Sequence, residues 1–140
     1  MRALMMIVIC SVTLAAQTAG GPQVTPQDLL DGLKDPTRWL TYGGDYSGTR
    51  NSPLTQITPE NVSQLSAQWT FQTGTLGSFQ TTPIVADGVI YATGFNNNAW
   101  AIDARSGRQI WRYRRNLPDD LKLCCGAVNR GFGVLGEGST

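Results

Sequence analysis

The 140-residue sequence contains no histidine, and only 15% of its residues carry a charge. Without histidine, this chain can hold no Ser-His-Asp triad, no histidine-containing zinc site and no covalent haem-attachment motif. Its net charge of +1 is nearly balanced, so it lacks the basic excess that marks nucleic-acid-binding proteins. The sequence therefore predicts no nucleic-acid partner.

Long apolar runs are also missing, except at the N-terminus. There residues 3–16 are apolar apart from two hydroxyl side chains, behind a positive charge at Arg2 and ahead of small residues that run to Gly21. This order is typical of a secretory signal peptide, and the run is too short to span a bilayer. We therefore predict a signal peptide over residues 1–20, and a periplasmic or secreted protein without a membrane span after its removal.

Cysteine is scarce, and two of the three cysteines, Cys124 and Cys125, are adjacent. Cys10 would leave with the signal peptide, so each remaining cysteine has only the other as a partner within the chain, in an oxidising compartment. Neighbouring α-carbons lie about 3.8 Å apart, closer than a disulfide prefers, so a bridge would close a small strained ring. We predict this disulfide as a rigid, polarizable surface; the alternative is two reduced thiols.

The second half of the chain has the pattern of short strands separated by turns. Asp87-Gly88 is a hairpin turn signal. A weaker alternation over Leu65–Gln72 predicts one further strand. Four short strands with tight turns form an antiparallel sheet of the size of one propeller blade. The four predicted strands are Pro83–Ala86, Val89–Thr93, Ala99–Asp103 and Gln109–Tyr113.

Helix signals are confined to the first half. Residues 23–33 predict a short helix with Thr25 as its N-cap and Pro26 in the first helical position. Thr58 resembles the cap of a one-turn helix, with Pro59 next. We divide the chain into a signal peptide (1–20), an N-terminal extension with a first strand region (21–62) and one truncated propeller blade or more (63–140).

One stretch is more specific than the strand spacing. Residues 101–111 carry the pattern Ala-x-Asp-x-x-Ser-Gly-x-x-x-Trp. Its Asp and Ser side chains can cap a turn, its Gly allows a positive φ, and Trp111 has a large ring to bury. Trp69 lies 42 residues before Trp111, which matches the repeat length of one blade. The alternative is a generic hairpin with one core tryptophan.

Several motifs together resemble one family. Over residues 36–135 the chain is similar to the pyrroloquinoline quinone (PQQ)-dependent alcohol dehydrogenases, quinoproteins with an eight-bladed β-propeller. The resemblance implies an all-β fold, with about one propeller blade plus flanking strands in this chain. It rests on Trp39-Leu-Thr-Tyr-Gly-Gly-Asp-Tyr-Ser-Gly-Thr-Arg-Asn-Ser-Pro-Leu, Ile57-Thr-Pro-Glu-Asn-Val, Thr82-Pro-Ile-Val-Ala-Asp-Gly-Val-Ile-Tyr, the 101–111 pattern and Cys124-Cys-Gly-Ala-Val-Asn-Arg-Gly.

The resemblance implies that four residues bind the cofactor. The family stacks its planar quinone on the ring of the adjacent cysteines, here Cys124 and Cys125, where polarizable sulfur suits an aromatic surface. Arg130 matches an arginine that contacts the cofactor, and a guanidinium suits its carboxylates. Gln80 stands where many members have a glutamate; an amide keeps the hydrogen-bonding capacity and loses the charge.

The resemblance also implies the reaction, which is oxidation of an alcohol with PQQ and calcium as cofactors and an acceptor such as a cytochrome c. The calcium ligands and the catalytic base are expected beyond residue 140, so we predict no catalytic and no metal-binding residue in this chain. We expect an N-terminal fragment that is inactive alone. The alternative is a non-enzymatic propeller-repeat scaffold of the cell envelope, which would not need the Cys-Cys-Gly-x-Val-Asn-Arg motif.

Overall fold

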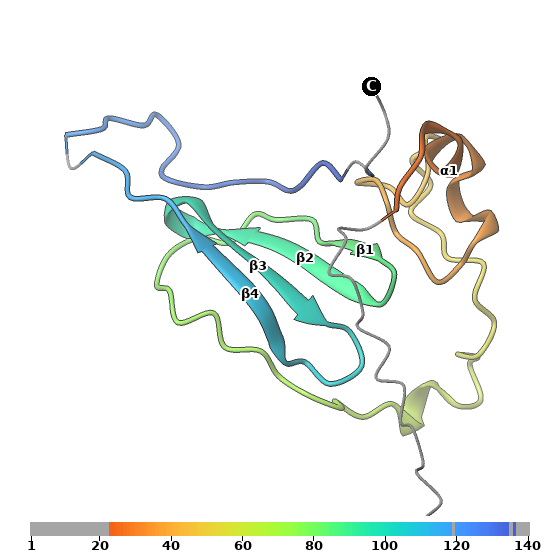
Figure 1. Cartoon of the computed structure of the whole chain (residues 1–140). Coiled ribbons are helices and arrows are strands. Elements are labelled where there is room, and N and C mark those ends of the chain that lie inside the picture. The colour runs from red at the N-terminus through yellow and green to blue at the C-terminus, as the bar shows by residue number, and fades with distance from the viewer. Residues whose placement is uncertain (1–22, 119, 135, 137–140) are drawn as a thin grey trace, which may run out of the picture.

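A computed structural model describes residues 23–118, 120–134 and 136, so the predicted signal peptide lies outside the described residues. The strands form one antiparallel sheet in the order β1-β2-β3-β4 (Figure 1). They confirm the four predicted strands and the all-β fold. The strands are β1 (Ile84–Ala86), β2 (Val89–Gly94), β3 (Asn98–Asp103) and β4 (Gln109–Arg114).

Two hairpin turns follow from residues that tolerate left-handed backbone angles. Asp87 and Gly88 have φ values of +52° and +77° and connect β1 to β2, as their turn signal predicted. Asn96 and Asn97, with φ values of +58° and +52°, form a short 3-10 turn between β2 and β3. Asparagine is among the few residues that adopt this conformation at moderate cost.

The β3–β4 turn has the predicted caps. The backbone N–H and the hydroxyl of Ser106 donate to one carboxylate oxygen of Asp103, at 2.7 and 2.6 Å. These bonds hold the pKa of Asp103 below its usual value, and the bond from the Ser106 hydroxyl has the largest effect. Gly107 follows with φ at +70°, which confirms the role predicted for the glycine.

The core tryptophan is Trp100, and the prediction of a buried Trp111 was wrong. Trp100 lies on the central strand β3 and is 1% exposed, packed against Phe71 and Phe79. Its indole N–H has no hydrogen-bond acceptor among the described residues. Trp111 lies on the edge strand β4, is 39% exposed, and contacts the rings of Tyr91 and Phe132. A central strand has a neighbour on each side, whereas an edge strand leaves its side chains partly open.

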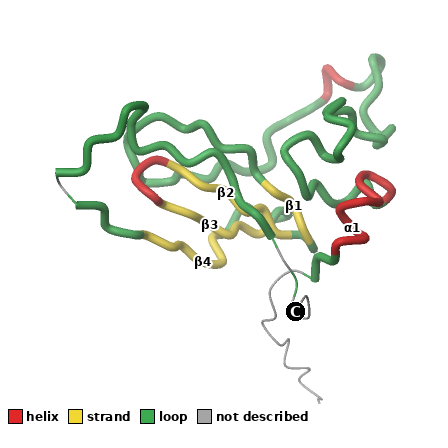
Figure 2. The backbone as a smooth tube through the Cα atoms, turned by 90° about the horizontal axis from the view of Figure 1, so that it is seen from above, coloured by secondary structure: helices red, strands yellow, loops and turns green. Residues whose placement is uncertain are grey.

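The other face of the sheet is covered by both ends of the described chain. Its buried cluster lies over β1, next to the helix α1 (Pro26–Asp31), whereas β4 is at the opposite edge of the sheet (Figure 2). The backbone N–H of Gly136 donates to the carbonyl of Val24 at 2.9 Å, which joins the two ends. The cluster consists of Val24, Leu40, Ile84 and Ala86, with Leu29, Tyr91, Phe132 and Val134 packed against it.

The predicted strand over Leu65–Gln72 is not formed. The segment has no ladder partner among the described residues, and its backbone is neither helix nor strand there. Trp69 within it is nevertheless anchored, because its indole N–H donates to the carbonyl of Ala104 at 3.1 Å. A Cβ atom at Gly107 would lie 2.5 Å from the Trp69 ring. The Trp69 ring therefore packs directly on the β3–β4 turn.

The N-terminal helix α1 spans Pro26–Asp31 and confirms Thr25 as its cap. The backbone N–H of Asp28 donates to the Thr25 hydroxyl at 3.2 Å, and the N–H of Thr25 donates to the Asp28 carboxylate at 2.7 Å. The bonds from Thr25 lower the pKa of Asp28, with a smaller effect of Arg38. A 3-10 helix over Gly32–Lys34 follows.

The predicted one-turn helix begins later than Thr58. The carbonyl of Thr58 accepts a hydrogen bond from the backbone N–H of Val62 at 2.9 Å, which closes a turn. A 3-10 helix then spans Val62–Gln64, with Asn61 at its N-cap.

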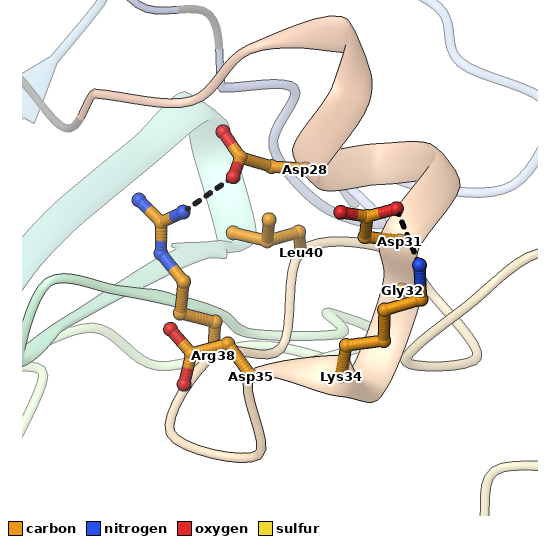
Figure 3. Close-up of a pocket in the computed structure, with 7 residues that line it drawn as sticks. All are labelled: Asp28, Asp31, Gly32, Lys34, Asp35, Arg38 and Leu40. Carbon is orange, nitrogen blue, oxygen red and sulfur yellow. Dashed lines mark hydrogen bonds and ion pairs between the residues drawn. The ribbon is translucent and has the colours of Figure 1, made fainter.

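A cavity of about 250 Å³ lies between α1 and the segment of residues 32–40, and it is lined mainly by charged side chains (Figure 3). Arg38 is the central group, since its guanidinium pairs with Asp28 at 3.3 Å and with Asp87 at 2.8 Å. It also donates to the carbonyl of Gln23 at 2.7 Å. Arg38 therefore joins α1 to the β1–β2 turn through its two ion pairs. None of the predicted site residues lines this cavity.

Candidate cofactor-binding site

The Cys-Cys motif, residues 124–131, follows β4 and is held at its downstream end. The backbone N–H of Asn96 donates to the carbonyl of Ala127 at 2.7 Å, and that of Thr82 donates to the carbonyl of Arg130 at 3.0 Å. A parallel bridge joins Thr82 to Gly131. The segment after β4 extends past the end of the sheet and then returns across it (Figure 1). These bonds anchor the returning part to the β2–β3 turn and to the segment before β1.

Cys124 and Cys125 lie in a turn and are both exposed. Their sulfur atoms are 3.0 Å apart, in contact, and both are thiols in the structure. A disulfide bond is about 2.05 Å long, so only a short approach separates the two states. The disulfide stays a prediction.

Arg130 and Gln80 are both exposed and lie on neighbouring segments. Thr82, whose N–H binds the carbonyl of Arg130, is two residues after Gln80. In the described part of the chain, neither the Arg130 guanidinium nor the Gln80 amide has a hydrogen-bond or ion-pair partner. The structure therefore brings two unpaired polar groups to adjacent segments, with the sulfur pair on the same loop as Arg130.

Three further residues hold this arrangement and were missed by sequence reasoning. Thr93 on β2 is 3% exposed, and its hydroxyl is 2.9 Å from that of Thr81 and 3.2 Å from the carbonyl of Asn129. The Asn129 side chain accepts from the N–H of Gly131 at 3.1 Å. No local pattern distinguishes these residues, because Thr93 and its partners are 12 and 36 residues apart.

Two cavities lie near the motif, and none of the four predicted cofactor residues lines either of them. One has a volume of about 300 Å³ and is bounded by polar groups that include Asn97, Asn129 and Arg115. The other, of about 440 Å³, is apolar and lies beside Trp111 and Tyr113. The four predicted cofactor residues are exposed and lie outside both cavities.

Residues 23–118, 120–134 and 136 contain neither a metal-binding cluster nor a membrane-spanning helix. No group of three or more His, Cys, Asp or Glu side chains there is placed to hold a metal ion. No helix in that part is long and apolar enough to cross a bilayer.

Comparison with known proteins shows which family the chain resembles. Residues 39–139 match the PQQ family of glucose/ethanol/alcohol dehydrogenases, β-propeller domain. The chain is 38% identical over 135 residues to the 1-butanol dehydrogenase (quinone) of Thauera butanivorans, which covers 94% of this chain and 21% of that protein. It is 42% identical over 98 residues to the 1-butanol dehydrogenase (cytochrome c) of the same organism, a match that covers 69% of this chain and 14% of that protein.

A solved structure agrees with the sequence matches. The quinohemoprotein alcohol dehydrogenase ADHIIG of Pseudomonas putida HK5 superposes with a TM-score of 0.73 at 37% identity, over 84% of this chain and 18% of that one. The chain therefore spans about a fifth, or less, of the length of the curated relatives it matches. Because the matched region takes in most of the sequence, the chain belongs to the PQQ-dependent alcohol dehydrogenase family, and its sheet is part of that family's β-propeller.

Proposed function

We propose that this chain contributes part of the quinone-binding site of a periplasmic PQQ-dependent dehydrogenase that oxidises alcohols. The observation that carries the proposal is that two polar side chains without partners lie on adjacent segments. The Arg130 guanidinium and the Gln80 side-chain amide have no hydrogen-bond or ion-pair partner among the described residues, and the contacting sulfurs of Cys124 and Cys125 are exposed on the same loop as Arg130. An unpaired cation and a polarizable sulfur pair on one loop suit a flat, anionic ring.

The chemistry of these side chains fits the cofactor. PQQ, when bound, supplies the oxidising group that accepts a hydride equivalent from the alcohol. Cys124 and Cys125 would support the ring by dispersion contacts. Arg130 would donate charge-assisted hydrogen bonds to a carboxylate, and Gln80 would add neutral ones. In our proposal these residues bind and orient the cofactor, and none of them moves a proton.

The remaining parts of the enzyme follow from the family. We infer that calcium and the catalytic base are supplied by residues other than those described, which contain no cluster for a metal ion. The electron acceptor is proposed to be a cytochrome c, because one relative is named as a cytochrome c-dependent 1-butanol dehydrogenase. The proposed periplasmic location rests on the signal pattern of residues 1–20.

A chimera tests the proposal. Residues 39–134 would replace the matching segment of the Pseudomonas putida ADHIIG enzyme, which supplies the rest of the propeller. We expect the purified chimera to retain PQQ after gel filtration and to oxidise alcohols. Arg130→Gln should weaken PQQ binding by about tenfold to a hundredfold, the usual range for a lost hydrogen bond to a charged group. Fluorescence titration with PQQ measures the effect.

Arg105→Gln is the matched control, because Arg105 is an exposed arginine on the β3–β4 turn, away from the motif. It should leave PQQ binding within twofold. A chimera that folds but retains no PQQ would contradict the proposal and favour the alternative of a non-enzymatic propeller-repeat scaffold. Equal losses in the two arginine variants would show that Arg130 has no specific role.

We further predict that the two sulfurs are joined in the exported protein. The motivating observations are their 3.0 Å separation and the signal pattern of the sequence. Mass spectrometry of non-reduced, alkylated material should find Cys124 and Cys125 unalkylated on one peptide, about two mass units below the dithiol form. Recovery of both cysteines in the alkylated form would show that the thiols persist.

A further inference from the structure

We propose that Thr81 and Thr93 form a hydroxyl clasp that positions Arg130 for the quinone. The clasp is the pair of threonine side chains whose hydroxyl oxygens lie 2.9 Å apart. The inference rests on the function proposed above and deepens it, because it assigns a positioning role to two residues that need not touch the cofactor.

The direction of each hydrogen bond in the clasp is determined. A carbonyl can only accept, so the Thr93 hydroxyl donates its one proton to the carbonyl of Asn129, at 3.2 Å. The Thr81 hydroxyl must then donate to Thr93, and it accepts in turn from the backbone N–H of Thr93 at 3.2 Å. Each hydroxyl therefore donates once and accepts once, and such chains strengthen one another.

The clasp joins the two segments that carry the predicted cofactor contacts. Thr81 directly follows Gln80, and Asn129 directly precedes Arg130. Thr93 belongs to β2, within the hydrogen-bonded sheet, so the clasp fastens both segments to a rigid element. The backbone N–H of Thr82 also donates to the carbonyl of Arg130, so a backbone hydrogen bond joins the same two segments.

Burial makes the clasp costly to open. Thr93 is 3% exposed, and its hydrogen bonds with Thr81 and Asn129 are partly buried, so water cannot easily replace a lost partner. Removal of the Thr93 hydroxyl would leave the Asn129 carbonyl and the Thr81 hydroxyl each without one bond. The segment that carries Arg130 would then lose a connection to the sheet and sample a wider range of positions.

The test uses the chimera described above, with Thr93→Val, Thr81→Val and the double variant. Valine keeps the branched shape and removes only the hydroxyl. We expect Thr93→Val to weaken PQQ binding by about tenfold, as for one buried hydrogen bond. Thr81→Val should weaken it less, because the bond from Thr93 to the Asn129 carbonyl remains, and the double variant should weaken it no more than Thr93→Val does. At saturating PQQ, kcat should stay within twofold, because the clasp acts on cofactor position. Thr93→Ser should restore binding to within twofold of the parent.

A second readout needs no cofactor. In the apo chimera, hydrogen exchange of the peptide over residues 126–134 should accelerate at least severalfold in Thr93→Val. Thr73→Val is the matched control, because Thr73 and Thr75 form a similar hydroxyl pair at 3.2 Å, in the 69–79 segment. This control should change neither the exchange of the 126–134 peptide nor the affinity for PQQ.

The outcomes separate the two proposals. If the parent chimera binds no PQQ, the proposed function fails, and apo hydrogen exchange still decides whether the clasp holds the segment. Unchanged exchange in Thr93→Val would overturn the clasp itself. Faster exchange with unchanged PQQ affinity would show a purely structural bond and would overturn the positioning role of the clasp. The positioning role would also be overturned if the fold-loss of PQQ affinity in the double variant equalled the product of the losses in the two single variants.

Discussion

Gly107→Ala is expected to destabilise the chain far more than Gly88→Ala, although both glycines have a positive φ. The values are +70° at Gly107 and +77° at Gly88, so backbone strain should cost about 1–2 kcal/mol at either position. A Cβ atom at Gly88 would have no atom within 4 Å, whereas one at Gly107 would meet the Trp69 ring at 2.5 Å. The Trp69 ring must therefore move, which should add about 2–3 kcal/mol in lost burial and a lost hydrogen bond.

Urea titration of the 140-residue chain, followed by tryptophan fluorescence, measures this difference. The Gly107→Ala variant should also show a red-shifted emission before unfolding, because Trp69 would leave the turn. Similar midpoints for the two variants would mean that Trp69 does not pack on Gly107, and the docking described for this tryptophan would then be wrong.

Trp100→Ala is expected to abolish cooperative unfolding of the isolated chain. Truncation of a buried tryptophan costs about 3–5 kcal/mol, and a small domain has only a limited stability to lose. Trp100 is 1% exposed, whereas Trp111 is 39% exposed, so Trp111→Ala should cost only about 1 kcal/mol in the same chain. Circular dichroism during a thermal melt distinguishes the two variants.

Trp100→Phe serves as the conservative control. The indole N–H of Trp100 has no acceptor among the described residues, so phenylalanine removes an unsatisfied donor while it keeps an aromatic ring. We expect this variant to melt within a few degrees of the parent. If Trp111→Ala proved as damaging as Trp100→Ala, the placement of the core around β3 would be refuted.

The features predicted correctly are those set by neighbours in sequence. The cap of α1 by Thr25 and the Asp87-Gly88 turn depend on residues within a few positions of each other. The choice between Trp100 and Trp111 depends instead on which strand is central, and both strands carry a tryptophan in a similar pattern. Leu65–Gln72 failed as a strand for a related reason, because pairing requires an adjacent edge that local sequence does not supply.

In the candidate site, too, some features depend on residues close in sequence and others depend on the fold. The choice of Cys124, Cys125, Arg130 and Gln80 as cofactor contacts follows from motifs read along the chain, and it stays a prediction. The clasp cannot be predicted from such motifs, because Thr93 is separated from its two partners by 12 and 36 residues. Threonine is also a common residue on strands, so its presence on β2 carries no signal until the fold places another hydroxyl beside it.

The spatial order of the strands is identical to their order along the chain, and this has a kinetic consequence. Each strand pairs with the next one through a short turn, so the whole sheet forms from contacts between near neighbours in sequence. Local contacts of this kind close quickly. We therefore expect residues 84–114 to fold first, while the pairing of Val24 with Gly136, which spans nearly the whole described chain, forms last.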